Sequence, residues 1–308
     1  MITKPVKLNT TTEVYPVDIG MWKRYSEFVN LEQQDLQKSN LITIPCKNGS
    51  GSLKFIMSKY LYELNETVSD LTKQISIEDI ETVLEDEVYY TAKIEGAKTT
   101  RKRTSELHNG APIDKNSEYS ERMTRNGFDA VKLLNLYGNR VDEDNLIEIW
   151  KVLTDGCCDN LSVRGEKYRS GDVYVGSFIP PSADTIPILM KEWVNFYNSP
   201  SYDTIPFIKA SILHFAFETI HPFCDGNGRM GRLLMNNYLI SRGIDSAKAV
   251  SFSMQIDATR NHYDAAFDDA ENSVNDITPF LHYMLDTMVD AYQTALAIQH
   301  NKTQQPKI

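Results

Sequence analysis

Residues 221–232 concentrate an imidazole, a carboxylate, three glycines and two arginines in the order His-Pro-Phe-Cys-Asp-Gly-Asn-Gly-Arg-Met-Gly-Arg. A Gly-Asn-Gly turn that leads into a helix leaves backbone N–H groups free to face an anion, and the helix dipole favours negative charge there. Arg229 and Arg232 are three residues apart, so both project from one face of the first helical turn. Each guanidinium can bind phosphate oxygens through two donors. The segment therefore predicts a polyphosphate site.

Two further side chains of this loop could supply reaction chemistry. Asp225 offers the hard oxygen ligand that Mg²⁺ takes when it also bridges phosphates. His221 could remove a proton from an attacking hydroxyl. Taken singly, each feature has an ordinary explanation: a histidine can cap a helix, Gly-Asn-Gly can be only a turn, and arginines three apart can form a solvated face. Their combination at fixed spacing favours nucleotide chemistry.

The loop is expected to lie between two packed helices, because apolar residues recur at helical spacing on both sides of it. Residues 207–220 predict the first helix and residues up to about Ser241 the second, which Arg242-Gly243 ends. The apolar positions are Ile208, Ile212, Phe215, Ala216 and Ile220 before the loop and Met230, Leu233, Leu234 and Tyr238 after it.

The loop resembles the signature of the Fic family, His-x-Phe-x-Asp/Glu-Gly-Asn-Gly-Arg-x-x-Arg, at every defined position. Family members are mostly helical, and most of them transfer AMP from Mg·ATP to a Tyr, Thr or Ser hydroxyl of a target protein. The resemblance implies an all-α Fic fold and covers roughly residues 76–290. The matching residues are His221, Phe223, Asp225, Gly226, Asn227, Gly228, Arg229 and Arg232.

The resemblance also implies a role for each residue of the loop. His221 would be the general base, Asp225 the Mg²⁺ ligand and Phe223 the anchor of the loop in the core. Arg229 would bind the phosphates and Arg232 the γ-phosphate. The α-phosphate would be held by Gly226, Asn227 and Gly228.

A second motif, Thr91-Ala-Lys-Ile-Glu95-Gly96, resembles the inhibitory pattern of the same family, Ser/Thr-x-x-x-Glu-Gly/Asn. It ends a predicted amphipathic helix over about 76–96, with Ser76 as the expected N-cap and Gly96 at the C-terminus. A Glu95 carboxylate paired with Arg232 would occupy the guanidinium that the γ-phosphate needs. The placement ahead of the Fic loop implies the subclass with an N-terminal inhibitory helix.

Residues 163–181 depart from the helical pattern. Apolar residues alternate with others around Val173 and Val175, and the segment contains a double proline. The pattern favours a short β-hairpin. Fic proteins carry such a hairpin as a flap over the active site, where a strand edge can hold a target segment by main-chain pairing. We therefore expect an unidentified target protein to bind along Val173 to Phe178, with a purely structural hairpin as the alternative.

The sequence divides at a flexible Gly-Ser run, 48–52, into a polar N-terminal segment, 1–52, and a Fic domain, 53–300. Residues 97–117 are expected to form a polar connecting segment, in which the basic run 98–103 is a solvated loop. Trp22, Tyr25 and Phe28 are spaced as one short helix face. The resemblance suggests that Tyr263 and Asn272 lie near the adenine, although Tyr263 also suits a core position. Further helices are predicted at 53–74, 118–137, 142–154, 260–272 and 278–299.

Composition excludes several other classes of protein. The net charge of −10 argues against a nucleic-acid binder, which needs clustered Lys and Arg. No apolar run approaches the roughly eighteen residues of a membrane span, and the N-terminus lacks a signal-like pattern. Cys46, Cys157, Cys158 and Cys224 show no metal-ligand spacing. Reduced thiols and a cytoplasmic location are the expectation.

The sequence thus predicts an autoinhibited protein adenylyltransferase that uses ATP and Mg²⁺ and also modifies itself. Two alternatives stay open. Glu95 could orient a water that removes AMP from a modified protein, which would make the chain a de-AMPylating hydrolase. Alternatively, the loop could only sense nucleotide as part of a binding module, although an intact His221 argues against a module that needs no base.

Overall fold

The computed structural model describes residues 53–304, apart from 54, 139, 177 and 273–275, and the backbone of four short strands before residue 53. Of residues 272, 303 and 304 it describes the backbone alone. The strands form two antiparallel pairs, β1 (Val6–Lys7) with β2 (Glu13–Val14) and β3 (Thr43–Cys46) with β4 (Gly49–Ser52). The Gly-Ser run expected to be a flexible break therefore forms strand β4, and the expected helix face at Trp22, Tyr25 and Phe28 lies outside the described residues.

The part of the chain from residue 53 onward is helical, as predicted. The helices are α2 (Lys59–Thr72), α3 (Ile80–Ile94), α4 (Arg101–His108), α5 (Glu118–Tyr137), α6 (Glu143–Leu153), α7 (Ile186–Asn198), α8 (Pro206–Ile220), α9 (Asn227–Ser241), α10 (Phe252–Ala258), α11 (Arg260–Asn272) and α12 (Thr278–Gln304). Short 3₁₀ turns occur at Leu161–Val163, Ala183–Thr185 and Asp245–Ala249.

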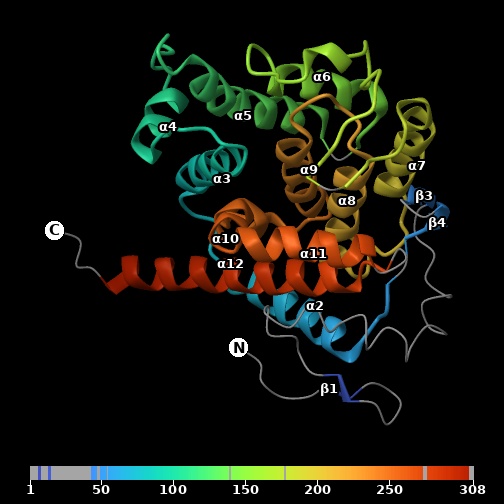
Figure 1. Cartoon of the computed structure of the whole chain (residues 1–308). Helices are drawn as coiled ribbons and strands as arrows, with labels where there is room; N and C mark the ends of the chain where they lie inside the picture. Colours follow the sequence, from blue (N-terminus) through green and yellow to red (C-terminus); the bar gives the residue numbers. More distant parts are fainter. Residues whose placement is uncertain are drawn as a thin grey trace.

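Helix α8 is the centre of the fold (Figure 1). Nearly all of its residues are buried, from Phe207 to Phe217 and again at Thr219 and Ile220. A helix that is apolar on every side needs partners on every side, and α8 packs against α9, α7, α2 and α12. Because α8 ends at Ile220 and α9 begins at Asn227, two helices of the core fix the ends of this loop.

Local capping chemistry explains where the predicted helices differ from the observed ones. The helix predicted from residue 53 begins at Lys59, because the Ser58 hydroxyl accepts a hydrogen bond from the Leu61 N–H at 3.0 Å. Ser76 does not cap α3. The helix begins at Ile80, three residues after Ile77, and the residue before it, Asp79, has a left-handed conformation with φ 55°. The Ser76 N–H instead donates to the side chain of Gln299 in α12.

The basic run expected to be a solvated loop is instead the start of helix α4. The Thr100 hydroxyl accepts from the Arg103 N–H at 3.1 Å and caps this helix. Arg103 forms an ion pair with Glu121 of α5 at 2.8 Å, and Arg101 pairs with Asp86 of α3. Tertiary ion pairs therefore stabilise a helix whose sequence has no clear apolar stripe.

The expected β-hairpin flap is not confirmed in the described residues. In its place the segment has two isolated antiparallel bridges, between Arg164 and Arg169 and between Val175 and Phe178. Val175 and Phe178 each donate a backbone hydrogen bond to the other, at 3.0 and 2.9 Å. The two prolines at the end of the segment limit further pairing, since proline has no N–H to donate.

No helix among the described residues has both the length and the apolar character needed to cross a membrane.

Candidate active site

Two residues in the left-handed conformation bracket the loop at the centre of the site. His221 ends α8 with φ 49° and ψ 59°, which is uncommon for a residue other than glycine. Gly226, with φ 79°, precedes α9. A Cβ at Gly226 would lie 2.8 Å from the Thr154 side chain, so glycine is required both for the backbone angle and for the close approach. These turns aim the N-terminus of α9 into the loop.

The loop is fixed to the core by an aromatic stack and by its own asparagine. Phe223 is fully buried and stacks on Trp150 of α6, with ring centroids 4.5 Å apart. The Trp150 indole N–H donates to the carbonyl of Asp225 at 3.0 Å. The Asn227 side chain bonds both the N–H and the carbonyl of Phe223, each at 2.9 Å. The Asn227 side chain thus fixes the loop, while its backbone N–H, in the first turn of α9, remains for an anion.

Replacing Phe223 with alanine should lower the free energy of unfolding by about 3–5 kcal/mol, the usual cost of deleting a buried phenylalanine. The reason is the cavity left beside Trp150. Urea denaturation followed by circular dichroism measures the change. Leu136→Ala is the matched control, because Leu136 is 81% exposed and should change stability little. A Phe223→Ala protein as stable as this control would contradict the anchoring role.

The contacts of His221 leave a free lone pair on Nε2 of its imidazole ring. Nδ1 lies 3.3 Å from the carbonyl oxygen of Glu218, and because a carbonyl can only accept, Nδ1 must carry the proton. Burial, helped by the nearby Arg169 charge, lowers the pKa of His221 to about 4, against the opposing effects of the Glu218 carbonyl and the Glu95 charge. The imidazole is therefore neutral near pH 7, with Nε2 free to accept a proton.

Asp225 lies at the mouth of the loop, with its side chain 19% exposed. One carboxylate oxygen accepts from the Asp159 N–H at 2.8 Å, and the other accepts from Gly226 at 2.6 Å and lies 3.4 Å from Arg229. Within the described part of the chain, no three His, Cys, Asp or Glu side chains cluster as metal ligands. A single partly exposed carboxylate fits Mg²⁺, which commonly uses one or two carboxylates together with substrate phosphates.

Both arginines of the loop are almost completely buried, each 2% exposed. Arg229 donates to the Leu153 carbonyl at 3.3 Å, and its Nε has no hydrogen-bond partner among the described residues. Arg232 donates through Nε to the Thr91 hydroxyl at 2.8 Å and through a terminal nitrogen to Glu95 at 2.6 Å. The predicted contact between Glu95 and Arg232 is thus present in the structure.

The Glu95 carboxylate lies directly over the first turn of α9. A Cβ added to Gly228 would be 2.3 Å from its oxygen, closer than any real contact. Burial by itself would raise the pKa of Glu95, but the charge and hydrogen bond of Arg232, with Arg229 and Arg260, outweigh it, so the pKa is lowered. Glu95 is therefore an anion in the space where a phosphate would meet Arg232 and the helix N-terminus.

Helix α3, whose C-cap residue is Glu95, is held along its length by α10 and its N-cap residue Ser251. The Glu87 carboxylate accepts from the Ser251 hydroxyl at 2.8 Å and from the Ser253 N–H at 3.0 Å. Lys93 forms an ion pair with Asp257 of α10 at 2.6 Å. These contacts position Thr91 and Glu95 against Arg232.

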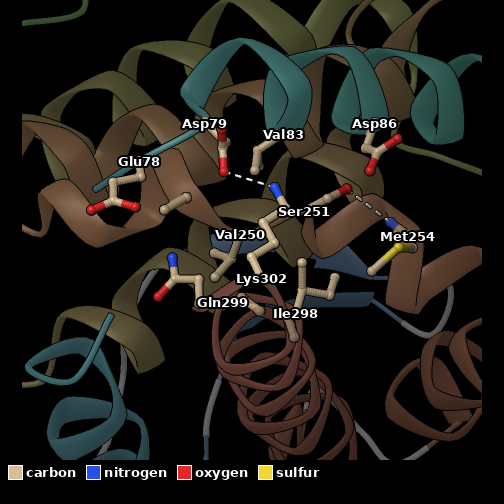
Figure 2. A pocket seen from close by; sticks show the side chains of 13 residues that line it. Glu78, Asp79, Val83, Asp86, Val250, Ser251, Met254, Ile298, Gln299 and Lys302 are labelled. Atoms are coloured by element: carbon tan, nitrogen blue, oxygen red, sulfur yellow. Dashed lines mark hydrogen bonds and ion pairs between the residues drawn. The ribbon is translucent and has the colours of Figure 1, made fainter. Parts of the chain in front are cut away.

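The start of α3 contacts the far end of α12 across a pocket that is separate from the loop (Figure 2). Asp79 pairs with Lys302 at 2.7 Å. The Gln299 amide donates to the Ser76 carbonyl at 2.7 Å. No residue of 221–232 lines this pocket.

The two residues suggested for adenine contact both belong to α11. Tyr263 is 5% exposed, and its hydroxyl lies 2.8 Å from Nε2 of His214 in the core. Its ring is surrounded by other aromatic side chains, including Phe267 and Phe280. Asn272 is the last residue of α11, and its side chain lies outside the described residues.

Arg169 supports the loop, although it belongs to no motif of the sequence. Its side chain is fully buried and donates to the carbonyls of His221, at 2.8 Å, and of Gly171 and Pro181. Its backbone N–H donates to the carbonyl of Pro222 at 2.9 Å. Arg169 thus ties residues 169–181 to the start of the loop at His221 and Pro222. Its partners are backbone carbonyls, which leave no pattern in a sequence.

Comparison with known proteins agrees with this geometry. Residues 140–239 match the model of the Fic/DOC family. The protein adenylyltransferase fic-1 of Caenorhabditis elegans is 29% identical over 204 residues, which are 64% of this chain and 38% of the relative. The protein adenylyltransferase Fic of Drosophila erecta is 40% identical over 82 residues, 26% of this chain and 17% of the relative. The chain therefore matches less than half the length of these relatives.

Solved structures support the fold. A Fic family protein from Desulfovibrio desulfuricans superposes with a TM-score of 0.69 at 23% identity, covering 80% of this chain and 77% of that one. Residues 134–508 of Fic-1 from C. elegans give a TM-score of 0.62 at 22% identity, covering 79% and 73%. The predicted Fic fold is therefore confirmed. The family match across the loop and the fold agree: residues 140–239 match the Fic/DOC family, and the described chain around them has the Fic fold.

Proposed function

We propose that this chain is an autoinhibited protein adenylyltransferase, which transfers AMP from Mg·ATP to a Tyr, Thr or Ser hydroxyl of a target protein. The observation that carries the proposal is the contact of Arg232 with Glu95 within a complete Fic loop. Relatives named protein adenylyltransferase support the class of reaction.

His221 acts on the nucleophile. Its neutral Nε2 accepts the proton of the target hydroxyl, and the hydroxyl oxygen then forms a bond to the α-phosphorus. The bond from the α-phosphorus to the bridging oxygen breaks, and pyrophosphate leaves. The N–H groups of Asn227, Gly228 and Arg229 have no acceptors within the helix, since they belong to its first turn. They are directed at the negative charge that the reaction redistributes.

Asp225 would hold the divalent ion, which neutralises phosphate charge and orients the leaving group when bound. Asp225→Ala should weaken Mg²⁺-dependent ATP binding, because its carboxylate lies at the mouth of the loop and the described residues contain no cluster that could replace it. Calorimetric titration of ATP with and without Mg²⁺ measures the loss. Asp70→Ala is the control, since Asp70 is exposed and lies in α2, outside the loop. Full transfer activity in excess EDTA would overturn this assignment.

Glu95 inhibits by occupying Arg232. In this structure the Arg232 guanidinium already has the Glu95 carboxylate as its partner, at 2.6 Å. An incoming γ-phosphate must displace this partner or bind elsewhere, and a misplaced γ-phosphate turns the α-phosphorus away from in-line attack. Movement of α3 would release the arginine. We infer that transfer requires such movement.

The target segment binds along the flap region. Tyr174 and Val175 are 74% and 42% exposed, so this segment presents apolar side chains to solvent. Arg169 ties the same segment to the loop at His221. Main-chain pairing would place a hydroxyl without demanding a particular sequence. Self-modification follows the same chemistry whenever a hydroxyl of the chain itself reaches His221.

The described cysteines are free, which fits a reducing cytoplasm.

A hydrolytic reaction is the second candidate, and the position of Glu95 favours it. The same carboxylate that contacts Arg232 lies beside the first turn of α9, where it could orient a water toward AMP bound to a modified protein. Incubating purified protein with AMPylated target and following AMP release by mass spectrometry distinguishes this reaction from transfer.

A further inference from the structure

Two cysteine thiols meet at the edge of the Fic loop. Cys158 Sγ and Cys224 Sγ are 3.4 Å apart although 66 residues separate them in sequence. A disulfide brings its sulfur atoms to about 2.05 Å, so the two need to approach by roughly 1.3 Å. Cys224 belongs to the loop, and Cys158 follows α6 in a segment without regular structure. One partner therefore lies where the backbone can adjust.

The segment that carries Cys158 also contacts Asp225. The Asp159 N–H donates to the Asp225 carboxylate at 2.8 Å, and the Asn160 side-chain amide donates to the Cys224 carbonyl at 3.4 Å. Cys158 is partly exposed, whereas Cys224 is buried. An oxidant from solvent can therefore reach Cys158 first, and Cys224 is in position to resolve the oxidised sulfur.

We propose that Cys158 and Cys224 form a redox modification site, at which a peroxide converts the two thiols to a disulfide and lowers the activity of the adjacent Fic loop. The disulfide depends only on the thiol geometry. The effect on activity rests on the proposed adenylyltransferase function.

The oxidation balances with hydrogen peroxide as the oxidant. The Cys158 sulfur attacks one peroxide oxygen, which gives a sulfenic acid and, after proton transfer, one water. The Cys224 sulfur then attacks the Cys158 sulfur, the S–S bond forms, and the hydroxyl leaves with the thiol proton as a second water. Two thiols are oxidised, and one peroxide is reduced to two waters.

The reaction should be slow at neutral pH. Burial, together with the hydrogen bond to Cys224, raises the pKa of Cys158 to about 12, and the thiolate is the reactive form. Sustained rather than brief exposure to peroxide is therefore needed.

Loss of activity follows from the position of Asp225 next to Cys224. Drawing the two sulfurs together by roughly 1.3 Å moves the segment that carries Cys158, and with it the Asp159 N–H that bonds to the Asp225 carboxylate. A misplacement of about 1 Å in a site can cost about 10²-fold in rate. We expect the oxidised protein to transfer AMP about 10- to 100-fold more slowly than the reduced protein.

Peptide mapping tests the disulfide itself. After prolonged treatment with hydrogen peroxide and digestion with trypsin without reductant, residues 152–164 should be linked to residues 210–229. Peptide 152–164 contains both Cys157 and Cys158, so matched variants identify the partner: the link should persist in Cys157→Ser and vanish in Cys158→Ser. Absence of the linked peptides, or their persistence in Cys158→Ser, would overturn the inference whatever the activity.

Activity is then compared in a Glu95→Gly background, where transfer is measurable. Labelling should fall on oxidation and recover with dithiothreitol, and Cys158→Ser should remove the sensitivity without changing reduced activity. A disulfide that forms without slowing transfer would refute its regulatory role. If reduced Glu95→Gly protein does not label targets but the disulfide forms, the proposed function fails and the modification site stands.

Discussion

Replacing Glu95 with glycine should raise AMP labelling of target proteins, and of the chain itself, by about 10- to 100-fold, within the range usual for a regulatory coupling. The expected gain follows from the 2.6 Å contact between Glu95 and Arg232, which the substitution removes. The measurement is incorporation of labelled AMP with cell lysate as the source of targets. Glu81→Gly is the matched control, because Glu81 is an exposed residue in the first turn of the same helix and does not reach the loop.

The gain should disappear when Arg232→Ala is added. Glu95 acts through the guanidinium that it occupies, so once Arg232 is absent nothing remains to be released. The two substitutions should therefore be strongly non-additive, as expected for residues in contact. A Glu95→Gly effect that survives Arg232→Ala in full would show that Glu95 inhibits by another route.

Other outcomes separate the remaining roles of Glu95. A merely structural residue would lower stability on replacement and leave specific activity flat or reduced. If Glu95 instead orients a hydrolytic water, Glu95→Gly should abolish AMP removal, and modified target would accumulate. Unchanged labelling together with unchanged removal would refute both assignments.

Replacing His221 with alanine should slow transfer by about 10²- to 10⁴-fold, the usual contribution of a general base. ATP affinity should change little, because the phosphates are assigned to the arginines and to the first turn of α9. Labelling in the Glu95→Gly background gives the rate, and calorimetry gives the affinity. A double variant that labels targets within a few-fold of Glu95→Gly would remove His221 from the mechanism.

The pH dependence of the same reaction provides an internal control. The pKa of His221 is lowered to about 4, so the base keeps its lone pair as the pH falls from about 8 to about 5 and loses it only near 4. In the free enzyme, kcat/KM should therefore show no acid-side inflection at the ordinary histidine value of about 6.5. An inflection there that His221→Ala abolishes would mean that the imidazole is more exposed in the active state.

Capping signals explain which elements could be predicted from the sequence. The predicted helix 118–137 matches α5, and Arg260–Asn272 matches α11, because apolar periodicity and end signals agree there. The start of α3 was wrong because Ser76 is engaged by Gln299, a residue far away in the sequence. Helix α4 was missed because its stability comes from ion pairs with α3 and α5, which periodicity cannot reveal.

The same distinction holds for the candidate site. The loop residues and the Glu95 contact could be predicted, since their motifs are short and fixed in spacing. The supports of the loop could not, because Trp150 and Arg169 act on backbone carbonyls of residues more than fifty positions away. Cys158 and Cys224 gave no signal either, because only the fold brings them within 3.4 Å.

The central claim is that the chain transfers the AMP part of ATP to a protein hydroxyl, and the position of a label tests it most directly. Glu95→Gly protein is incubated with lysate and Mg·ATP that carries the label in either the α- or the γ-phosphate, with the Glu95→Gly, His221→Ala protein as the control. We expect α-labelled protein bands that are absent with the control protein, and no γ-labelled band beyond those that kinases of the lysate give with the control protein. Additional γ-labelled bands, or the same α-labelled bands without His221, would contradict the proposed reaction.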